Sequence, residues 1–280
     1  MKTVTTIEEA RKIIKEWKQE GKSIGFVPTM GFLHEGHGSL ITKAGENDKV
    51  VVSIFVNPMQ FGPAEDLANY PRDLAKDSAL CESLGTDLIF HPDASQMYEE
   101  GFCSYADMGV LTQELCGLSR PVHFRGVCTV LTKLFNIIQP DRAYFGQKDA
   151  QQAAIVKRLV RDFNIPVEII SCPIVREEDG LAKSSRNTYL SAEERREALV
   201  LSKAVFLGSK MAKEGESSAE AVLQAMTAEI MKSPMAKIDY IKAVDGLTME
   251  QIKVLKAPAL VAMAVYIGKT RLIDNFIIEA

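Results

Sequence analysis

Between residues 24 and 175, short apolar runs rich in β-branched and aromatic side chains alternate with segments of helical periodicity. Runs that are apolar on both faces are typical of parallel strands covered by helices on both sides. Strands that alternate with helices predict an α/β fold, a Rossmann-like doubly wound parallel sheet, whose ligands bind beyond the carboxyl ends of the strands. The predicted strands are Ile24–Val27, Val50–Val56, Asp87–Phe90, Arg142–Phe145 and Val167–Val175.

The helical segments between these strands carry their own start signals. Thr6 and Glu9 form a capping box before a helix that ends at Gly21. Further helices are expected from about Glu35, over residues 71–84, over residues 126–138 and over residues 150–163.

Beyond Val175 the pattern changes to a polar stretch, two helices and three strand-like segments. Ser191 with Glu194 caps the first helix, and the second helix is expected over residues 218–231. Strands are expected over residues 238–244, 260–267 and 272–278. The sequence therefore predicts a Rossmann-like domain over residues 1–176 and a smaller C-terminal α+β domain over residues 177–280.

Composition narrows the classes of partner. The chain has 33 Lys and Arg against 37 Asp and Glu, a net charge of −4, so we expect no nucleic-acid partner. Five cysteines without a Cys-x-x-Cys pair indicate free buried thiols in a reducing cytoplasm, with no disulfides and no structural metal site. The longest apolar run, residues 257–268, is too short for a membrane span, and residues 1–20 lack the apolar core of a secretory signal.

Two of the four histidines fall in one turn after the first strand, in the sequence Pro-Thr-Met-Gly-Phe-Leu-His-Glu-Gly-His-Gly of residues 28–38. The segment is neither a Walker A loop nor a dinucleotide-binding glycine motif. His34 and His37 share one face at a helix N-terminus, beside unpaired N–H groups and the positive end of the dipole, so a phosphate is the expected ligand. Gly36 leaves room for a base or a ribose. The alternative is that each imidazole only satisfies a local hydrogen bond.

Two further segments combine cations with small polar side chains. Gly146-Gln147-Lys148-Asp149 follows a strand and precedes a helix; its lysine suits phosphate oxygens, and its aspartate suits a helix cap, ribose hydroxyls or a metal. Lys183-Ser184-Ser185-Arg186-Asn187 suits a flexible clamp for nucleotide phosphates. A helix cap with a solvated lysine would explain the first segment, and a polar hinge loop would explain the second.

Neutral amides follow the strand that ends at Val56. Asn57 and Gln60 offer donors and acceptors without charge, which suits a small hydroxy acid, and Gln151-Gln152 could present a second amide to the same pocket. The turn Arg120–Gly126 is cationic, and it suits either a carboxylate ligand or the neutralisation of acidic neighbours.

Taken together and in this order, five segments closely resemble the pantoate–β-alanine ligase family, of the nucleotidyltransferase superfamily with His-x-Gly-His motifs. The resemblance is dense from residue 1 to about residue 190. It implies that ATP and pantoate form pantoyl adenylate and pyrophosphate, that β-alanine then attacks to give pantothenate and AMP, and that Mg²⁺ accompanies the ATP. It also suggests a homodimer. The segments are Pro28–His37, Val56–Gly62, Arg120–Gly126, Ala143–Asp149 and Ser184–Asn187.

The resemblance also implies roles for single residues. His37 is marked as a general acid and His34 shares the phosphate contact, with Lys148 and Arg186 as further catalytic cations. Gln60 would contact pantoate and β-alanine, Gln152 would contact pantoate, and Asn57 would lie close by. The implied ATP-binding residues are Met30, Gly31, Phe32, Leu33, His34, Glu35, Gly36, His37, Gly146, Gln147, Lys148, Asp149, Val175, Lys183, Ser184, Ser185 and Arg186.

Small departures from the family pattern and two rival functions remain. Gly38 stands where the family usually has a larger apolar residue, and Lys183 stands where it often has a nonpolar one.

An adenylyltransferase that leaves AMP on its product would share His-x-Gly-His but would not explain the amides. A non-catalytic nucleotide-binding module would not need the full set of phosphate-binding groups. We also expect the C-terminal domain to close over a water-sensitive adenylate.

Overall fold

The computed structural model describes residues 1–63, 65 and 67–279 of the chain. The described chain forms two compact units. Unit 1 comprises residues 1–108, 120–147 and 155–173, and unit 2 comprises residues 109–119, 148–154 and 174–280. Unit 2 thus includes two short segments that lie, along the chain, between the stretches of unit 1. The division at residues 176 and 177 stays a proposal.

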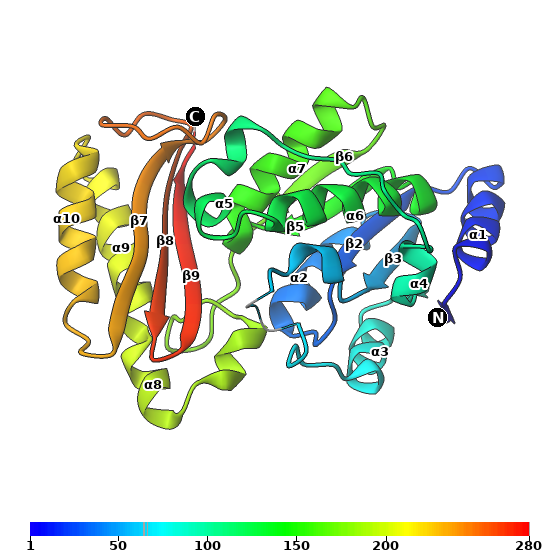
Figure 1. Ribbon diagram of the computed structural model, residues 1–280, viewed down its shortest axis with the longest axis horizontal. Coiled ribbons are helices and arrows are strands. Elements are labelled where there is room, and N and C mark those ends of the chain that lie inside the picture. Colours follow the sequence, from blue (N-terminus) through cyan, green and yellow to red (C-terminus); the bar gives the residue numbers. More distant parts are fainter. Residues whose placement is uncertain (64, 66, 280) are drawn as a thin grey trace. The chain divides into compact units, whose positions relative to one another are not determined.

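Unit 1 is built on a six-stranded sheet, of which Figure 1 labels β2, β3, β5 and β6. Its neighbouring strands are parallel, in the order β1-β4-β3-β2-β5-β6. The predicted Rossmann-like α/β fold is confirmed. The strands are β1 (Lys2–Val4), β2 (Ile24–Thr29), β3 (Lys49–Ile54), β4 (Leu88–Phe90), β5 (Arg142–Gly146) and β6 (Glu168–Cys172).

Helices connect these strands, and the predicted capping box of Thr6 and Glu9 starts the first of them. The short helix η3 (Gln147–Asp149) and helix α7 (Ala150–Asp162) each have residues in both units. The other helices of unit 1 are α1 (Ile7–Gln19), α2 (Glu35–Ala44), η1 (Pro58–Gln60), α3 (Leu74–Ser83), α4 (Ala94–Met97) and α6 (His123–Ile138).

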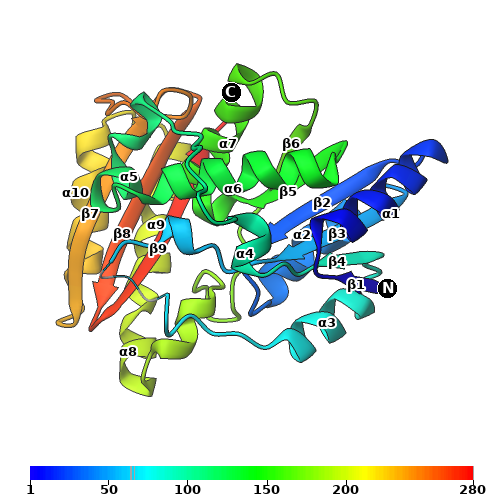
Figure 2. The same ribbon diagram turned by 45° about the vertical axis from the view of Figure 1, so that its right-hand side comes forward.

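Helices cover both faces of the sheet, as neighbouring residues of β2 show. Consecutive side chains of a strand point to opposite faces. The ring of Phe26 lies 6.4 Å from that of Phe135 on α6. Val27, the next residue, packs instead with Leu40 and Ile41 of α2. The helices α2 and α6 can be followed in Figure 2.

The parallel register brings the ends of three strands to one edge of the sheet. Thr29, the last residue of β2, pairs with Ile54, the last residue of β3, and β5 pairs with β2 on the other side. The turn that carries the two histidines, the helix η1 and the start of η3 therefore all follow this carboxyl edge. Proteins with such open sheets bind ligands there.

Unit 2 contains a three-stranded antiparallel sheet in the order β7-β8-β9, and the predicted α+β character is confirmed. Helices α9 and α10 lie side by side along this sheet (Figure 1), and residues such as Val222, Met226 and Met263 form the core between the layers. The elements are η2 (Val110–Thr112), α5 (Leu115–Ser119), η4 (Ser185–Tyr189), α8 (Ala192–Glu197), α9 (Leu199–Lys213), α10 (Ala219–Ile230), β7 (Ala236–Asp245), β8 (Ala259–Ile267) and β9 (Thr270–Ile278).

Some boundaries differ from the sequence predictions. Helix α6 begins at His123, three residues before the glycine that was expected to open it, so part of the predicted cationic turn is helical. The strand β2 continues through Pro28, which is tolerated because the pairing of β2 with β5 involves only Gly25 and Phe26. The strand β1 was not predicted, because three residues at the start of a charged segment give no periodic signal.

The cysteines are free, but only Cys81, Cys128 and Cys172 are buried. Cys103 is exposed and Cys116 is partly exposed, so the expectation of five buried thiols is wrong for these two. None of the helices in the described part of the chain has both the length and the hydropathy needed to cross a membrane.

Candidate functional site

A buried carboxylate holds the turn between β2 and α2. Gly31 and Phe32 both have positive φ, 84° and 51°, a conformation that costs energy in a residue with a side chain. Asp77 of α3 accepts the N–H groups of Phe32 and Leu33 at 2.8 and 2.6 Å, and only 1% of its surface is exposed. Burial raises the pKa of Asp77, and the two N–H donors oppose that rise. Asp77 was not among the predicted site residues, because it lies more than forty residues away, in a helix without a motif.

The two histidines form a reciprocal cap at the start of α2. Nδ1 of His34 accepts the N–H of Gly36 at 3.1 Å, and Nδ1 of His37 accepts the N–H of His34 at 3.3 Å. Their ring centroids are 4.2 Å apart. The expected unpaired N–H groups are thus partly wrong, because the imidazoles occupy two of them.

These caps fix the tautomer of both rings. A nitrogen that accepts a hydrogen bond carries no proton, so the neutral form of His34 and of His37 has its proton on Nε2. Nε2–H is a hydrogen-bond donor, the group that a phosphate oxygen requires. A phosphate contact would therefore use a different nitrogen from the local hydrogen bond, so the two interpretations of the motif are compatible.

Asn57 is a buried residue whose side chain is fully occupied within unit 1. Its Oδ1 accepts from the N–H of Met59 at 3.2 Å and from the hydroxyl of Tyr98 at 2.7 Å. Its Nδ2 donates to the C=O of Gly126 at 3.0 Å and to Oε1 of Gln60 at 3.1 Å. An Asn side chain has two donors and an acceptor with two lone pairs, so none of its capacity is left over.

The orientation of the Gln60 amide follows from Asn57. Backbone N–H can only donate and backbone C=O can only accept, so Met59 and Gly126 determine which atom of Asn57 is oxygen. Oε1 of Gln60 must then face Asn57, and Nε2 of Gln60 donates to Sδ of Met30 at 3.1 Å. Sulfur is a weak acceptor, so a substrate oxygen can replace it.

The Arg120–Gly126 segment neutralises acidic neighbours, which decides between its two predicted roles. Arg120 forms a bidentate ion pair with Glu65, with both N···O distances 2.7 Å, and Arg125 pairs with Asp107 at 2.8 Å. Nδ1 of His123 lies 3.1 Å from the C=O of Gln60. The segment thus supports the turn that carries Gln60.

Lys148 belongs to unit 2 and is held by the C-terminal strand. Its C=O accepts from Nδ2 of Asn275 at 2.9 Å. Nζ of Lys148 lies 3.9 Å from the carboxylate of Asp149, whose side chain is 51% exposed. Lys148 and Ser184 also line one hollow of about 10 Å³, which is enough for about one water molecule.

Hydrogen bonds connect the Lys183–Asn187 segment to residues 175–182. Ser184 caps η4, and its Oγ accepts the N–H of Arg186 at 3.3 Å. The N–H of Lys183 donates to the C=O of Val175 at 2.9 Å. Nδ2 of Asn187 donates to Glu177 at 2.8 Å and to the C=O of Ala182 at 3.1 Å. The flexibility of this clamp stays a prediction.

Gln151 is structural, and the sequence did not separate it from Gln152. Its Nε2 donates to the C=O groups of Leu111 and Glu114 at 2.9 and 2.8 Å, and its Oε1 accepts the N–H of Cys116 at 2.9 Å. These bonds fix residues 109–119 of unit 2. Gln152, half-buried, is the amide of α7 that remains a substrate candidate.

The predicted site residues divide between the two units. Unit 1 contains residues 30–37, Asn57, Gln60, Gly146 and Gln147, and unit 2 contains Lys148, Asp149, Gln152, Val175 and residues 183–186.

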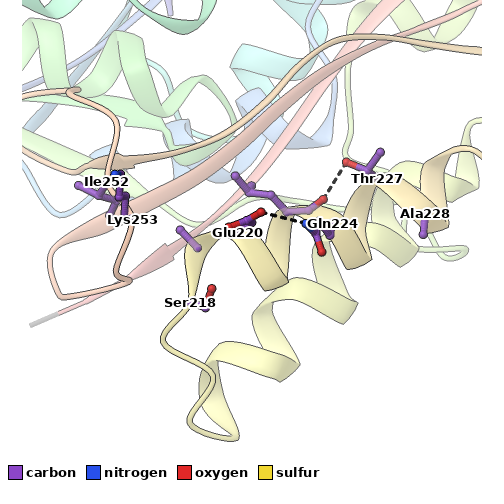
Figure 3. Close-up of a pocket in the computed structure, with 9 residues that line it drawn as sticks. Ser218, Glu220, Gln224, Thr227, Ala228, Ile252 and Lys253 are labelled. Atoms are coloured by element: carbon purple, nitrogen blue, oxygen red, sulfur yellow. Dashed lines mark hydrogen bonds between the residues drawn. The ribbon is translucent and has the colours of Figure 1, made fainter.

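Two other features of the described residues bear on ligand binding. Unit 2 has an open groove of about 640 Å³ between α10 and residues 252–253, and no predicted site residue lines it (Figure 3). Among the described residues, no group of three or more His, Cys, Asp or Glu side chains could hold a metal ion.

Comparison with known proteins gives matches over nearly the whole chain. The family model described as pantoate-beta-alanine ligase matches residues 2–277. Pantothenate synthetase from Ruminiclostridium cellulolyticum is 65% identical over 276 residues, which cover 99% of this chain and 98% of the relative. One from Clostridium botulinum strain Loch Maree is 58% identical over 277 residues, which cover 99% of each chain.

Solved structures agree with these sequence matches. Pantothenate synthetase from Thermus thermophilus superimposes with a TM-score of 0.94 at 44% identity, and the match covers 100% of both chains. Pantoate-beta-alanine ligase from Francisella tularensis, solved as a complex with beta-gamma ATP and β-alanine, gives a TM-score of 0.81 at 36% identity. That match covers 99% of this chain and 97% of the relative.

Proposed function

The chain belongs to the pantoate–β-alanine ligase family, and from this premise we propose how its residues carry out the reaction. The enzyme condenses pantoate with β-alanine in an ATP-dependent reaction that yields pantothenate, AMP and pyrophosphate. The observation that carries the assignment of roles is the His34–His37 cap, which directs two Nε2–H donors away from the helix backbone.

In the first step, a carboxylate oxygen of pantoate attacks the α-phosphorus of ATP, and the bond to the β-phosphate oxygen breaks. The products are pantoyl adenylate and pyrophosphate. Negative charge develops on the phosphate oxygens, so preorganised donors lower the barrier. We assign that role to His34, His37, Lys148 and Arg186, and His37 is the general acid. Residues 30–37, Gly146–Asp149, Val175 and Lys183–Arg186 are the proposed ATP-binding residues.

In the second step, the amine of β-alanine attacks the acyl carbon of the adenylate, and AMP leaves. Adenylation has already supplied a good leaving group, so the protein needs no nucleophilic Ser or Cys. The enzyme must exclude water, because water would hydrolyse the same intermediate. The Lys183–Asn187 segment is the proposed cover over the phosphates.

Pantoate is the proposed ligand of Gln60 and Gln152, and Gln60 also contacts β-alanine. The Nε2 of Gln60 donates, so the substrate atom that it meets is a carboxylate or hydroxyl oxygen. Asn57 was expected to lie close by, as one of the substrate-binding residues. Because its four hydrogen bonds are internal, we assign it instead the task of orienting Gln60.

Mg²⁺, a homodimer and a cytoplasmic location complete the proposal. A site for the ion built only from protein side chains does not fit the described residues, whereas Mg²⁺ is commonly held by substrate phosphates with one or two carboxylates. Asp149, half of whose side chain is exposed, is the carboxylate that fits this arrangement, and the ion would offset phosphate charge. Free thiols support a reducing compartment.

Isotope exchange between pyrophosphate and ATP tests the reaction. Labelled pyrophosphate should enter ATP only when pantoate is present, because the adenylate must form before the step can reverse. AMP should accumulate only when β-alanine is added as well. Exchange that does not depend on pantoate would contradict the ligase, and AMP retained on the product would favour an adenylyltransferase. Binding of ATP without any exchange would indicate a nucleotide-binding module.

A further inference from the structure

We propose that Asp274 and Asn275, adjacent residues of β9, are positioning residues that hold the two phosphate-binding segments of unit 2 in register. One segment contains Lys148, and the other contains Ser184 and Arg186. The inference rests on the proposed function, since it takes these segments as the ones that bind the triphosphate. It goes further by giving the C-terminal strand a part in ATP binding.

Asn275 holds the first segment through its backbone. Its Nδ2 donates to the C=O of Lys148 at 2.9 Å, across 127 positions of sequence. Only 3% of Asn275 is exposed, so water does not compete for this bond. The accepting C=O belongs to η3, just before α7 begins at Ala150, so the bond fixes the backbone of Lys148 where the chain enters that helix.

Asp274 holds the second segment through an ion pair. Its two carboxylate oxygens accept from Nη1 and Nη2 of Arg176 at 2.7 and 2.9 Å, and the side chain is 1% exposed. Nη1 of Arg176 also donates to the C=O of Gly180 at 3.1 Å, and Arg176 forms an antiparallel bridge with Ala182. A bidentate pair fixes the guanidinium plane, so this turn is held firmly immediately before Lys183.

The two contacts are coupled within β9 itself. The N–H of Asn275 donates to Oδ1 of Asp274 at 2.8 Å, the same oxygen that accepts from Arg176. Lys148, Ser184 and Asp274 line the same small hollow. The distance between the two phosphate-binding segments is therefore set by the side chains of two neighbouring residues on one strand.

Nucleotide binding to the full-length protein, measured by calorimetry without pantoate, tests the proposal. Two variants should each weaken ATP binding about tenfold. Asn275→Ala removes the donor, and the isosteric Asn275→Asp places an oxygen against the C=O of Lys148. Binding of AMP should change less than about twofold, because AMP lacks the β- and γ-phosphates. Adding Asn275→Ala to Lys148→Ala should cause no further loss, because Asn275 acts through Lys148.

Asn136→Ala is the matched control, because Nδ2 of Asn136 also donates to a backbone C=O, at 2.8 Å, but on an exposed face of α6. It should leave both affinities unchanged. Equal weakening of ATP and AMP, additive losses with Lys148→Ala, or unchanged ATP binding in a folded Asn275→Asp protein would each overturn the proposal. Wild-type protein that binds ATP but shows no pantoate-dependent exchange would instead contradict the proposed function, and the binding test would still stand.

Discussion

Each imidazole of the His34–His37 pair uses one ring nitrogen for structure and directs the other away from the backbone. The Nδ1 atoms cap α2, and this determines that the protons of the neutral rings lie on Nε2. Asn57 acts in a similar way on Gln60, whose amide it orients through one hydrogen bond. For the histidines, the local hydrogen bond determines which ring nitrogen carries the proton of the neutral form. For Gln60, it determines that Oε1 faces Asn57 and that Nε2 is the donor.

Replacement of His37 separates its two tasks. His37→Asn keeps an acceptor, Oδ1, for the N–H of His34 but removes the Nε2–H donor, whereas His37→Ala removes both. Both variants should lower the rate of adenylation at least about tenfold. His37→Ala should also lose about 1 kcal/mol of stability, the usual cost of a helix cap. Pyrophosphate exchange and thermal unfolding measure the two effects. A wild-type rate in His37→Asn would remove the role assigned to His37.

The cysteines should differ strongly in reactivity. Burial raises the pKa of Cys81 to about 11 and that of Cys128 to about 12. A raised thiol pKa favours the neutral form, so at pH 8 about one Cys81 in a thousand is the reactive thiolate. A maleimide should therefore label exposed Cys103 first and should reach Cys81 and Cys128 only after unfolding. Mass spectrometry of peptides measures this order, and Cys103→Ser should abolish the fast phase.

At the scale of elements, the position of η1 depends on how closely α6 approaches it. A Cβ atom at Gly126 would lie 2.4 Å from the C=O oxygen of Met59 and 2.5 Å from the Cα of Gln60. The sequence predicted a helix from about this glycine, although glycine is a poor helix former. In the structure Gly126 lies inside the helix because only glycine leaves room for η1.

Gly126→Ala should displace η1 and, with it, Gln60. In an ordinary helical position this change stabilises by up to about 1 kcal/mol, but the overlap here should destabilise the protein by about 1–3 kcal/mol. The affinity for pantoate should fall as well. Denaturant unfolding and pantoate titration measure both. Gly38→Ala is the control for stability, because Gly38 also lies inside a helix and a Cβ there meets only the flexible end of the Leu84 side chain, at 3.2 Å. Unchanged stability in Gly126→Ala would contradict the close approach.

At the scale of the whole molecule, the net charge of −4 does not attract two anionic substrates. The groups that hold them must be local, and the proposed ATP-binding residues belong to both compact units, with His34 in unit 1 and Lys148 in unit 2. The proposed function therefore assigns residues of both units to the recognition of one ligand.

ATP should stabilise both units against heat. A ligand at one hundred times its Kd that binds only the folded state adds about 2.7 kcal/mol. Since the proposed site uses residues of both units, every unfolding transition seen by calorimetry should move upward with ATP, and Lys148→Ala should reduce the shift. A shift confined to one of two transitions would contradict the division of the site between the units.

The sequence by itself determined the order of the longer strands and helices, the α/β and α+β classes and the motifs that belong to the pantoate–β-alanine ligase family. Those features depend on hydrophobic periodicity and residue type over short stretches of sequence, because the pattern within one element follows which of its faces is buried. Only the tertiary structure identified Asp77, Tyr98 and Asn275 as the partners of the motif residues, along with the tautomers of the two histidines. These contacts join residues 41 to 127 positions apart, and no local pattern connects such distant segments before the chain folds.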